Sequence, residues 1–172
     1  MFTEKTLGMP RIALVGCSAS KCDHPAPARD FYTSRLFRAS YDYAEKTCDA
    51  VLIVSAFYDV VAPTQKLHPY DQNLRIYTKR EREDWGVRTV GQILPAVDMP
   101  PQLVILAGKL YADALLHGAH WRNLPRPEEP LRGIAGCSPR VKWLKANTPI
   151  NEEAQRARGC CSGRNRDEEV VE

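Results

Sequence analysis

Two short segments of this sequence hold the residue types needed for chemistry on an anionic or ring-shaped ligand. The first, Cys17-Ser18-Ala19-Ser20-Lys21, places two hydroxyls and one cation in a turn of small residues. Such a turn can offer backbone N–H groups, hydroxyl donors and an ammonium group to an anion or to the edge of a base. Its spacing matches neither the Walker loop nor the dinucleotide-binding turn, so no motif specifies the ligand.

The second segment runs from residue 55 to residue 71 and is expected to be a long irregular loop between a buried strand and the next helix, and such loops are usually functional. A carboxylate beside a sugar can stabilise the positive charge of a breaking glycosidic bond or orient a water molecule, and a tyrosine can stack on a base. Taken singly, the second aspartate can equally cap the following turn, and the histidine is more often a surface residue. The candidate side chains are Ser55, Tyr58, Asp59, His68, Tyr70 and Asp71.

Three apolar runs indicate the strands that position these segments. Residues 11–16, 50–55 and 102–107 are short and continuously apolar, as in strands buried on both faces of a parallel sheet. The residues that follow these runs therefore meet at one edge of the sheet, where ligands bind in such folds. The third run is followed by Gly108-Lys109-Leu110-Tyr111, which adds Tyr111 to the candidate site.

The segments between the predicted strands show the periodicity of helices. Thr33 or Ser34 can cap a first helix, residues 79–94 read as an amphipathic crossover helix that stops near Pro95, and further helices begin at Gly108 and at Pro139. This alternation predicts a single α/β domain over residues 1–147, with a mainly parallel central sheet and helices on both faces. Residues 148–172 are predicted to be a weak helix and a partly flexible tail.

Length, charge and composition predict where the protein works and which partners it lacks. The chain has 172 residues and a net charge of +3, which is the size of one domain and too small a charge to identify a partner. It shows no secretory leader, no run of 18 apolar residues and no Cys-x-x-Cys pair. We therefore expect a cytoplasmic protein with reduced thiols, no membrane association, no metal and no cofactor.

Basic residues gather in two local clusters, and each has two interpretations. Arg75, Lys79, Arg80 and Arg82 form one cluster, and Arg140, Lys142 and Lys145 form the other. Either cluster can be a solvated helix face or a surface for a phosphate backbone. Likewise, Trp143 can pack beneath its helix or meet a splayed base.

Several motifs occur along the chain: Cys17–Lys21, Tyr32 with Ser34, Leu36 and Phe37, Ser55-Ala56-x-Tyr58 with Val61 and Pro63, Pro69-Tyr70-Asp71 with Leu74, and Gly108-x-x-Tyr111. Taken together, these motifs resemble the YaaA-like superfamily over residues 11–147, and the late stretch from Gly133 or Gly136 through Arg140 to Leu144 fits its small bacterial and phage branch. One departure is Asp59, which stands at a turn position where the family has glycine.

The resemblance implies a core similar to that of uracil-DNA glycosylases and an association with DNA or modified nucleosides. Related proteins include glycosylases that remove hypermodified bases from phage DNA as a bacterial defence. The motifs of the uracil enzymes themselves are not recognisable in this chain, so catalytic roles cannot be copied from them.

The leading hypothesis is a DNA glycosylase that flips a modified base into a pocket, hydrolyses its N-glycosidic bond and leaves an abasic site. Asp71 is the expected catalytic carboxylate, Asp59 is the reserve, and Tyr70 assists. The expected base-binding or nucleotide-binding residues are Ser18, Ser20, Lys21, Ser55, Tyr58 and Tyr111, and the expected DNA-backbone contacts are Arg35, Arg140 and Lys142.

Two other functions remain open from the sequence. One is a non-catalytic, DNA-binding stress-response protein that uses the same basic surface. The other is an N-glycosidic hydrolase of free nucleosides or nucleotides, for which the basic clusters would be incidental. No obligate protein partner is inferred in any of the three cases.

Overall fold

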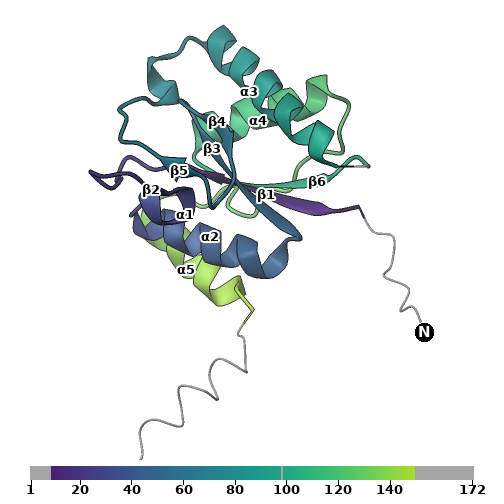
Figure 1. Ribbon diagram of the computed structural model, residues 1–172. Helices are drawn as coiled ribbons and strands as arrows, with labels where there is room; N and C mark the ends of the chain where they lie inside the picture. The colour runs from purple at the N-terminus through teal and green to yellow at the C-terminus, as the bar shows by residue number, and fades with distance from the viewer. Residues whose placement is uncertain (1–8, 98, 150–172) are drawn as a thin grey trace, which may run out of the picture.

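A four-stranded sheet with the strand order β4-β3-β1-β6 forms the centre of the computed structural model, which describes residues 9–97 and 99–149 (Figure 1). Strand β1 (Arg11–Gly16) lies between β3 (Ala50–Ser55) and β6 (Gln102–Leu106) and is parallel to both. The sheet is therefore mainly parallel, and the carboxyl ends of these three strands meet at one edge.

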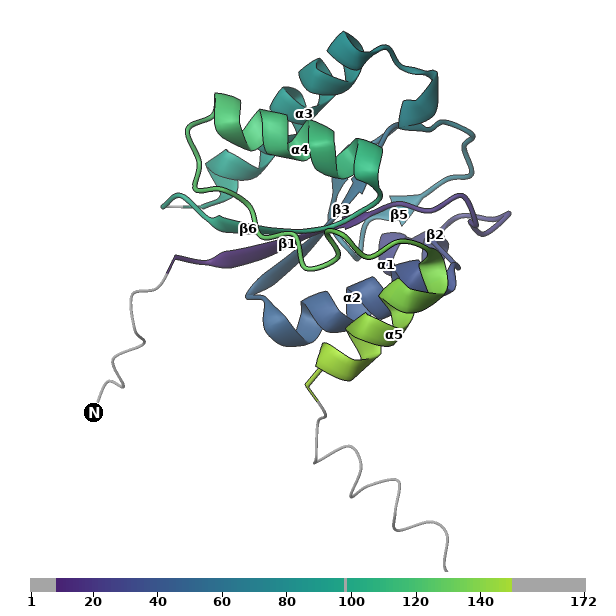
Figure 2. The ribbon, with the colours of Figure 1, turned by 180° about the vertical axis from the view of Figure 1, so that it is seen from behind.

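Helices cover both faces of the sheet, as the two opposite views show (Figures 1 and 2). The short α1 (Ala28–Phe31), α2 (Arg35–Thr47) and α5 (Cys137–Asn147) lie on one face. The other face carries α3 (Lys79–Ile93) and α4 (Lys109–Trp121). The mixed α/β architecture expected from the alternation of strands and helices is confirmed.

Alternating side chains of β1 supply the core on both sides of the sheet. Ile12 and Leu14 pack with the residues of α3 and α4, whereas Ala13 and Val15 pack with those of α2 and α5. All four are at most 4% exposed. This double burial explains why the strand reads as a continuous apolar run rather than as an alternating one.

Local capping sets the starts of the two long helices that follow β1 and β3. The Ser34 hydroxyl accepts a hydrogen bond from the Phe37 N–H at 3.1 Å, which fixes the start of α2. Thr78 and Glu81 form a reciprocal capping box at the start of α3. Of the two caps considered for the first helix, the structure uses Ser34.

Two glycines let α3 and α4 pack backbone against backbone. A Cβ atom on Gly86 would lie 1.9 Å from the Ala114 carbonyl oxygen, and one on Gly118 would lie 2.2 Å from the Gly86 carbonyl oxygen. No real Cβ atom can stand that close to a backbone oxygen. The layer on this face of the sheet therefore depends on both residues having no side chain.

The connection between β3 and α3 is more ordered than the sequence predicts. It contains β4 (Asp59–Val61), β5 (Lys66–Leu67) and a short 3₁₀ turn (Leu74–Ile76), and β5 pairs with β2 (Ala26–Pro27). The expectation of a long irregular loop is wrong here, because β4 turns back antiparallel on β3 and buries Val61 in the core.

The free edge of β6 is covered by a loop from later in the chain. The Ile105 N–H donates to the Glu128 carbonyl and the Glu128 N–H donates to the Leu103 carbonyl, both at 2.8 Å. The Glu128 carboxylate also accepts a hydrogen bond from the Arg11 guanidinium at 2.8 Å. These contacts fix residue 128 beside the sheet as a single bridging residue.

Candidate functional site

The carboxyl ends of β1 and β6 form the topological switch point of the sheet. From β1 the chain crosses to β3 on one side by way of α2, and it later returns to β6 on the other side by way of α3. Crevices at such points are the usual ligand sites of open α/β sheets. A cavity of about 60 Å³, which we call the switch-point cavity, lies there; its lining includes Cys17, Ser18, Ser34, Ser40, Ala107 and Gly108.

Close approach of the two strand ends gives this cavity its shape. A Cβ atom on Gly16 would lie 2.8 Å from the Ala107 Cβ, so only glycine allows the chain segments to approach this closely. The N-cap residues of α2 and α4, Ser34 and Gly108, border the cavity. Two helix N-termini, each with a partial positive charge, therefore face the same small space.

A network of three phenols, one hydroxyl and one thiol lies beside the switch-point cavity, and we call it the phenol–thiol cluster: Tyr32, Tyr70, Tyr111, Ser55 and Cys17. The Tyr70 hydroxyl lies 2.8 Å from both the Tyr32 hydroxyl and Ser55 Oγ. Cys17 Sγ contacts the Tyr111 hydroxyl at 3.2 Å. Since Cys17 also lines the cavity, the cluster and the cavity share a wall.

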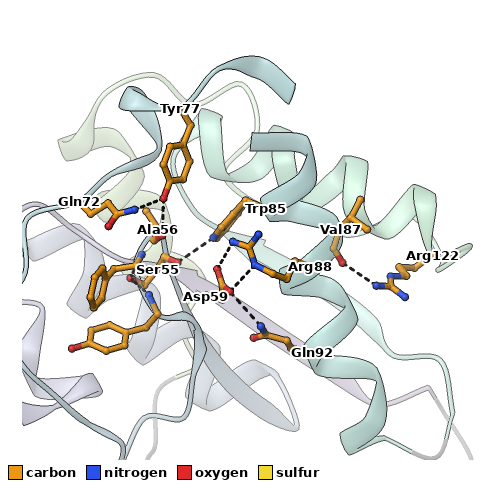
Figure 3. Close-up of polar contacts among 12 residues, drawn as sticks. Ser55, Ala56, Asp59, Gln72, Tyr77, Trp85, Val87, Arg88, Gln92 and Arg122 are labelled. Atoms are coloured by element: carbon orange, nitrogen blue, oxygen red, sulfur yellow. Dashed lines mark hydrogen bonds and ion pairs between the residues drawn. The ribbon is translucent and has the colours of Figure 1, made fainter. Parts of the chain in front are cut away.

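The direction of one hydrogen bond in this cluster follows from its neighbours. Ser55 Oγ accepts from the backbone N–H groups of Phe57 at 3.1 Å and Tyr58 at 3.3 Å. A hydroxyl oxygen has two acceptor sites, so the Ser55 proton is left to donate to Tyr70. Figure 3 shows the same residue accepting from Trp85 through its carbonyl, at 3.2 Å.

Burial keeps the phenols of this cluster neutral. Removal from water raises the pKa of Tyr32 to about 12. It also raises the pKa values of Tyr70 and Tyr111 well above the ordinary range, with the nearby Cys17 thiol as a further cause. At neutral pH Tyr70 is thus a hydrogen-bonding group that can orient a ligand, rather than a base.

These raised pKa values predict a loss of stability in alkali. Unfolded tyrosines lose their protons near about pH 10, whereas the buried phenols keep theirs, so above that pH the unfolded state binds fewer protons and the free energy of unfolding falls. Urea unfolding at about pH 8 and about pH 11 measures the fall. The Tyr70→Phe variant should lose less stability over this interval; equal losses in both proteins would contradict the assignment.

Lys21 is held against the cluster instead of extending into solvent. Its ammonium group lies 4.6 Å from the centre of the Tyr70 ring, a cation–π contact, and its backbone bridges to that of Tyr32. Tyr58 is tied to His68, whose N–H donates to the Tyr58 hydroxyl at 3.2 Å. The Ser18 hydroxyl donates to the carbonyl of the exposed Ser20 at 2.8 Å and so shapes the turn.

The two candidate carboxylates occupy different surroundings. Asp71 is exposed and directly follows Tyr70, a member of the phenol–thiol cluster. Asp59 instead faces α3, where Arg88 grips it through two hydrogen bonds of 2.8 and 3.0 Å and Gln92 adds a third at 3.3 Å (Figure 3). The structure therefore does not bring Asp59 together with the other expected catalytic groups.

Asp59 also adopts a backbone conformation that suits glycine. Its φ angle is +57°, in the left-handed region, which aspartate tolerates better than most residues. Aspartate at position 59 thus keeps the backbone conformation expected of glycine and adds an ion pair with Arg88 of α3.

Substitutions at this position should separate its two roles. Asp59→Asn keeps the tolerance for positive φ but loses the ion pair, and we expect it to lower the free energy of unfolding by up to about 1 kcal/mol. Asp59→Ala loses both features and should cost roughly 1 kcal/mol more. Urea denaturation measures both values, and equal costs for the two variants would contradict the backbone argument.

The expected DNA-backbone residues lie on the α2 and α5 side of the edge. Arg35 and Lys142 are exposed. Arg140 is half-buried, and its Nε donates to the Ile134 carbonyl at 2.7 Å, which directs the guanidinium. Arg140 lines a cleft of about 200 Å³ together with Lys109 and Arg132, and this cleft shares Ala107 and Leu131 with the switch-point cavity.

The two cations that accompany Arg140 in this cleft are partly neutralised. Lys109 pairs with Asp113 at 3.1 Å, and Arg132 pairs with Glu129 at 2.8 Å. Trp143 lies outside the cleft, where its ring packs against Tyr43 with 5.7 Å between ring centres. Of its two interpretations, the structure favours packing beneath the helix.

One residue at this edge was not singled out from the sequence. Phe57 is 53% exposed, although it directly follows the buried Ser55-Ala56 pair. The available signal was an aromatic residue two positions after a strand end, which periodicity alone cannot distinguish from a core residue.

The described residues contain neither a metal-binding cluster nor a membrane-spanning helix. In the described residues no cluster of three or more histidine, cysteine, aspartate or glutamate side chains is arranged to hold a metal ion. Nor does any described helix have the length and apolar character needed to cross a membrane.

Comparison with known proteins gives one match. No curated protein and no solved structure matches the chain. The model of a family of unknown function, DUF6884, matches residues 12–146, which include the sheet except for Arg11, the phenol–thiol cluster and the residues that line the switch-point cavity. Because this match spans most of the 172 residues, the chain belongs to the DUF6884 family.

Proposed function

We propose that this protein is a DNA N-glycosylase that excises a modified base, including the hypermodified bases of phage DNA, and leaves an abasic site. The proposal includes a YaaA-like ancestry and a core of the uracil-DNA-glycosylase type. Within residues 9–97 and 99–149, Cys17, Cys22, Cys48 and Cys137 form no disulfide with one another, which fits the reducing cytoplasm where invading DNA would be met.

The observation that carries the proposal is the grouping at the carboxyl edge of the sheet. A small cavity with two helix N-termini, the phenol–thiol cluster and an exposed carboxylate adjoin one another there. Pockets for whole ligands usually measure about 300–1,000 Å³, so a cavity of about 60 Å³ suits a small group such as a phosphate. In this proposal the phosphate of the target nucleotide enters the cavity, and its base lies toward Lys21 and Tyr58.

Asp71 is the better candidate for the catalytic carboxylate. Its charge is free of hydrogen bonds and ion pairs to other residues within 9–97 and 99–149, whereas that of Asp59 is engaged by Arg88. The reaction needs a carboxylate that can approach the sugar as positive charge develops there. The fixed Tyr70 next to it would orient the base or a water molecule through its neutral hydroxyl.

The chemical step requires only water and these side chains. The bond between C1′ of the sugar and the base nitrogen breaks, and the bonding electrons leave with the base. Asp71 stabilises the oxocarbenium-like sugar and guides water to C1′; the water oxygen bonds to C1′ and one of its protons is finally taken up by the departing base. Arg35, Arg140 and Lys142 hold the flanking backbone.

The deciding experiment is incubation of the protein with genomic DNA from phages that carry different base modifications. Mass spectrometry of the released bases and cleavage of the DNA at abasic sites report the reaction. Release of one modified base from its DNA supports the proposal. Salt-dependent binding without release from any DNA would leave the non-catalytic alternative, and release from free nucleosides only would shift the substrate to small molecules.

A further inference from the structure

Phe57 exposes an aromatic ring whose position is fixed by backbone and side-chain contacts. Its backbone N–H is held by Ser55 Oγ at 3.1 Å, and the preceding Ala56 is 3% exposed. The ring stacks on Tyr70 with 5.2 Å between centres and an interplanar angle of 19°, and it meets Tyr58 edge to face at 4.7 Å. The position of this half-exposed ring is therefore set before any ligand arrives.

The Tyr70 ring, on which Phe57 stacks, is already covered by other side chains. Tyr70 is contacted by Phe31 at 6.2 Å, by Tyr58 at 5.3 Å and by the Lys21 ammonium group at 4.6 Å. A base that reaches this part of the edge thus meets Phe57 first. Stacking on a base, which was expected of Tyr58 and Tyr70, is therefore better suited to Phe57, which packs on both of them.

An exposed basic segment is tied to the residue that precedes this ring. The Tyr77 hydroxyl donates to the Ala56 carbonyl at 3.4 Å and is also contacted by Gln72, so the Tyr77 side chain connects this segment to the end of β3 (Figure 3). This segment exposes Arg75 and Arg80, and it exposes 70% of Ile76. Neither arginine forms an ion pair within the described ranges.

We propose that Phe57, with Arg75 and Arg80, forms a binding surface for an unpaired nucleotide. The base stacks on the outer face of Phe57, and the arginines contact the phosphates on either side. This gives a role to the basic cluster that contains Arg75 and Arg80, which the proposed mechanism does not use. The inference takes its ligand, a nucleic acid strand, from the proposed function, but it does not depend on base release.

The test measures the affinity of the full chain for a fluorescent single-stranded oligothymidine by anisotropy. Phe57→Ala should weaken binding about 5- to 100-fold, which corresponds to the loss of one stacked base. Phe57→Trp should restore the affinity. The matched control is Trp121→Ala, because Trp121 is 67% exposed but lies at the far end of α4, away from the carboxyl edge.

Charge and stacking can be separated in the same assay. Arg75→Gln and Arg80→Gln should each lower the slope of log affinity against log salt by about 0.7, the value for one phosphate contact on a single strand. Unchanged affinity in Phe57→Ala, or equal weakening in Phe57→Trp, would overturn the proposal. If no DNA releases a base but Phe57→Ala still loses affinity, the glycosylase assignment fails and this surface stands.

Discussion

Asp71→Asn is expected to abolish base release while leaving DNA binding intact. Asparagine keeps the size of the side chain but removes the negative charge, so the developing positive charge on the sugar loses its partner. A positioned acid–base group contributes about 10²- to 10⁴-fold to a rate, and a loss within this range is expected. Mass spectrometry of released base under single-turnover conditions measures it.

The matched control for this variant is Asp42→Asn. Asp42 is an exposed aspartate in the middle of α2, so its substitution removes the same charge from a surface outside the site. Its rate of base release should equal that of the unaltered protein. Full activity in Asp71→Asn would instead remove Asp71 from the mechanism and direct attention to Asp59, whose release from Arg88 would then be required.

Gly86→Ala is expected to cause the largest loss of stability, about 3 kcal/mol, which is the upper part of the usual range for overpacking. The new methyl group would lie 1.9 Å from the Ala114 carbonyl oxygen, so the backbones of α3 and α4 would have to separate. Alanine's higher helix propensity would offset only about 1 kcal/mol of the strain. Urea denaturation followed by circular dichroism gives the free energy of unfolding.

Gly91→Ala is the control in the same helix. A Cβ atom at Gly91 would meet only the guanidinium group of Arg122, at 2.4 Å, and the end of a flexible side chain can move aside. We therefore expect this variant to be neutral or slightly stabilising. A similar loss of stability in both variants would show that the cost comes from the helix itself and not from the contact between α3 and α4.

The parts of the fold that depend on local composition were predictable. The three strands appear where the apolar runs predict them, with β6 ending one residue earlier, at Leu106. The helices begin close to Ser34, Thr78, Gly108 and Pro139 because caps, glycine and proline act within a few residues. Convergence of the strand ends followed from the parallel order alone.

The features that leave no local pattern were not predictable. Strand β4 has only three residues, too few to show an alternating pattern, although it pairs with the preceding strand β3 across a tight turn at Asp59. The ion pair between Asp59 and Arg88 joins residues 29 positions apart. The cluster around Tyr70 was expected as a group of separate ligand contacts, but its hydroxyls bind one another, since burial requires each polar group to find a partner.

The loop that lies beside β6 also affects how this protein behaves in concentrated solution. An uncovered edge strand offers free N–H and C=O groups to a second molecule, which is a common route to aggregation. Here Glu128 occupies the hydrogen-bonding groups of Leu103 and Ile105, and the opposite edge is divided between the three residues of β4 and the first three residues of β3. Neither side of the sheet offers a long template, so copies of the chain are protected from joining edge to edge into a continuous sheet.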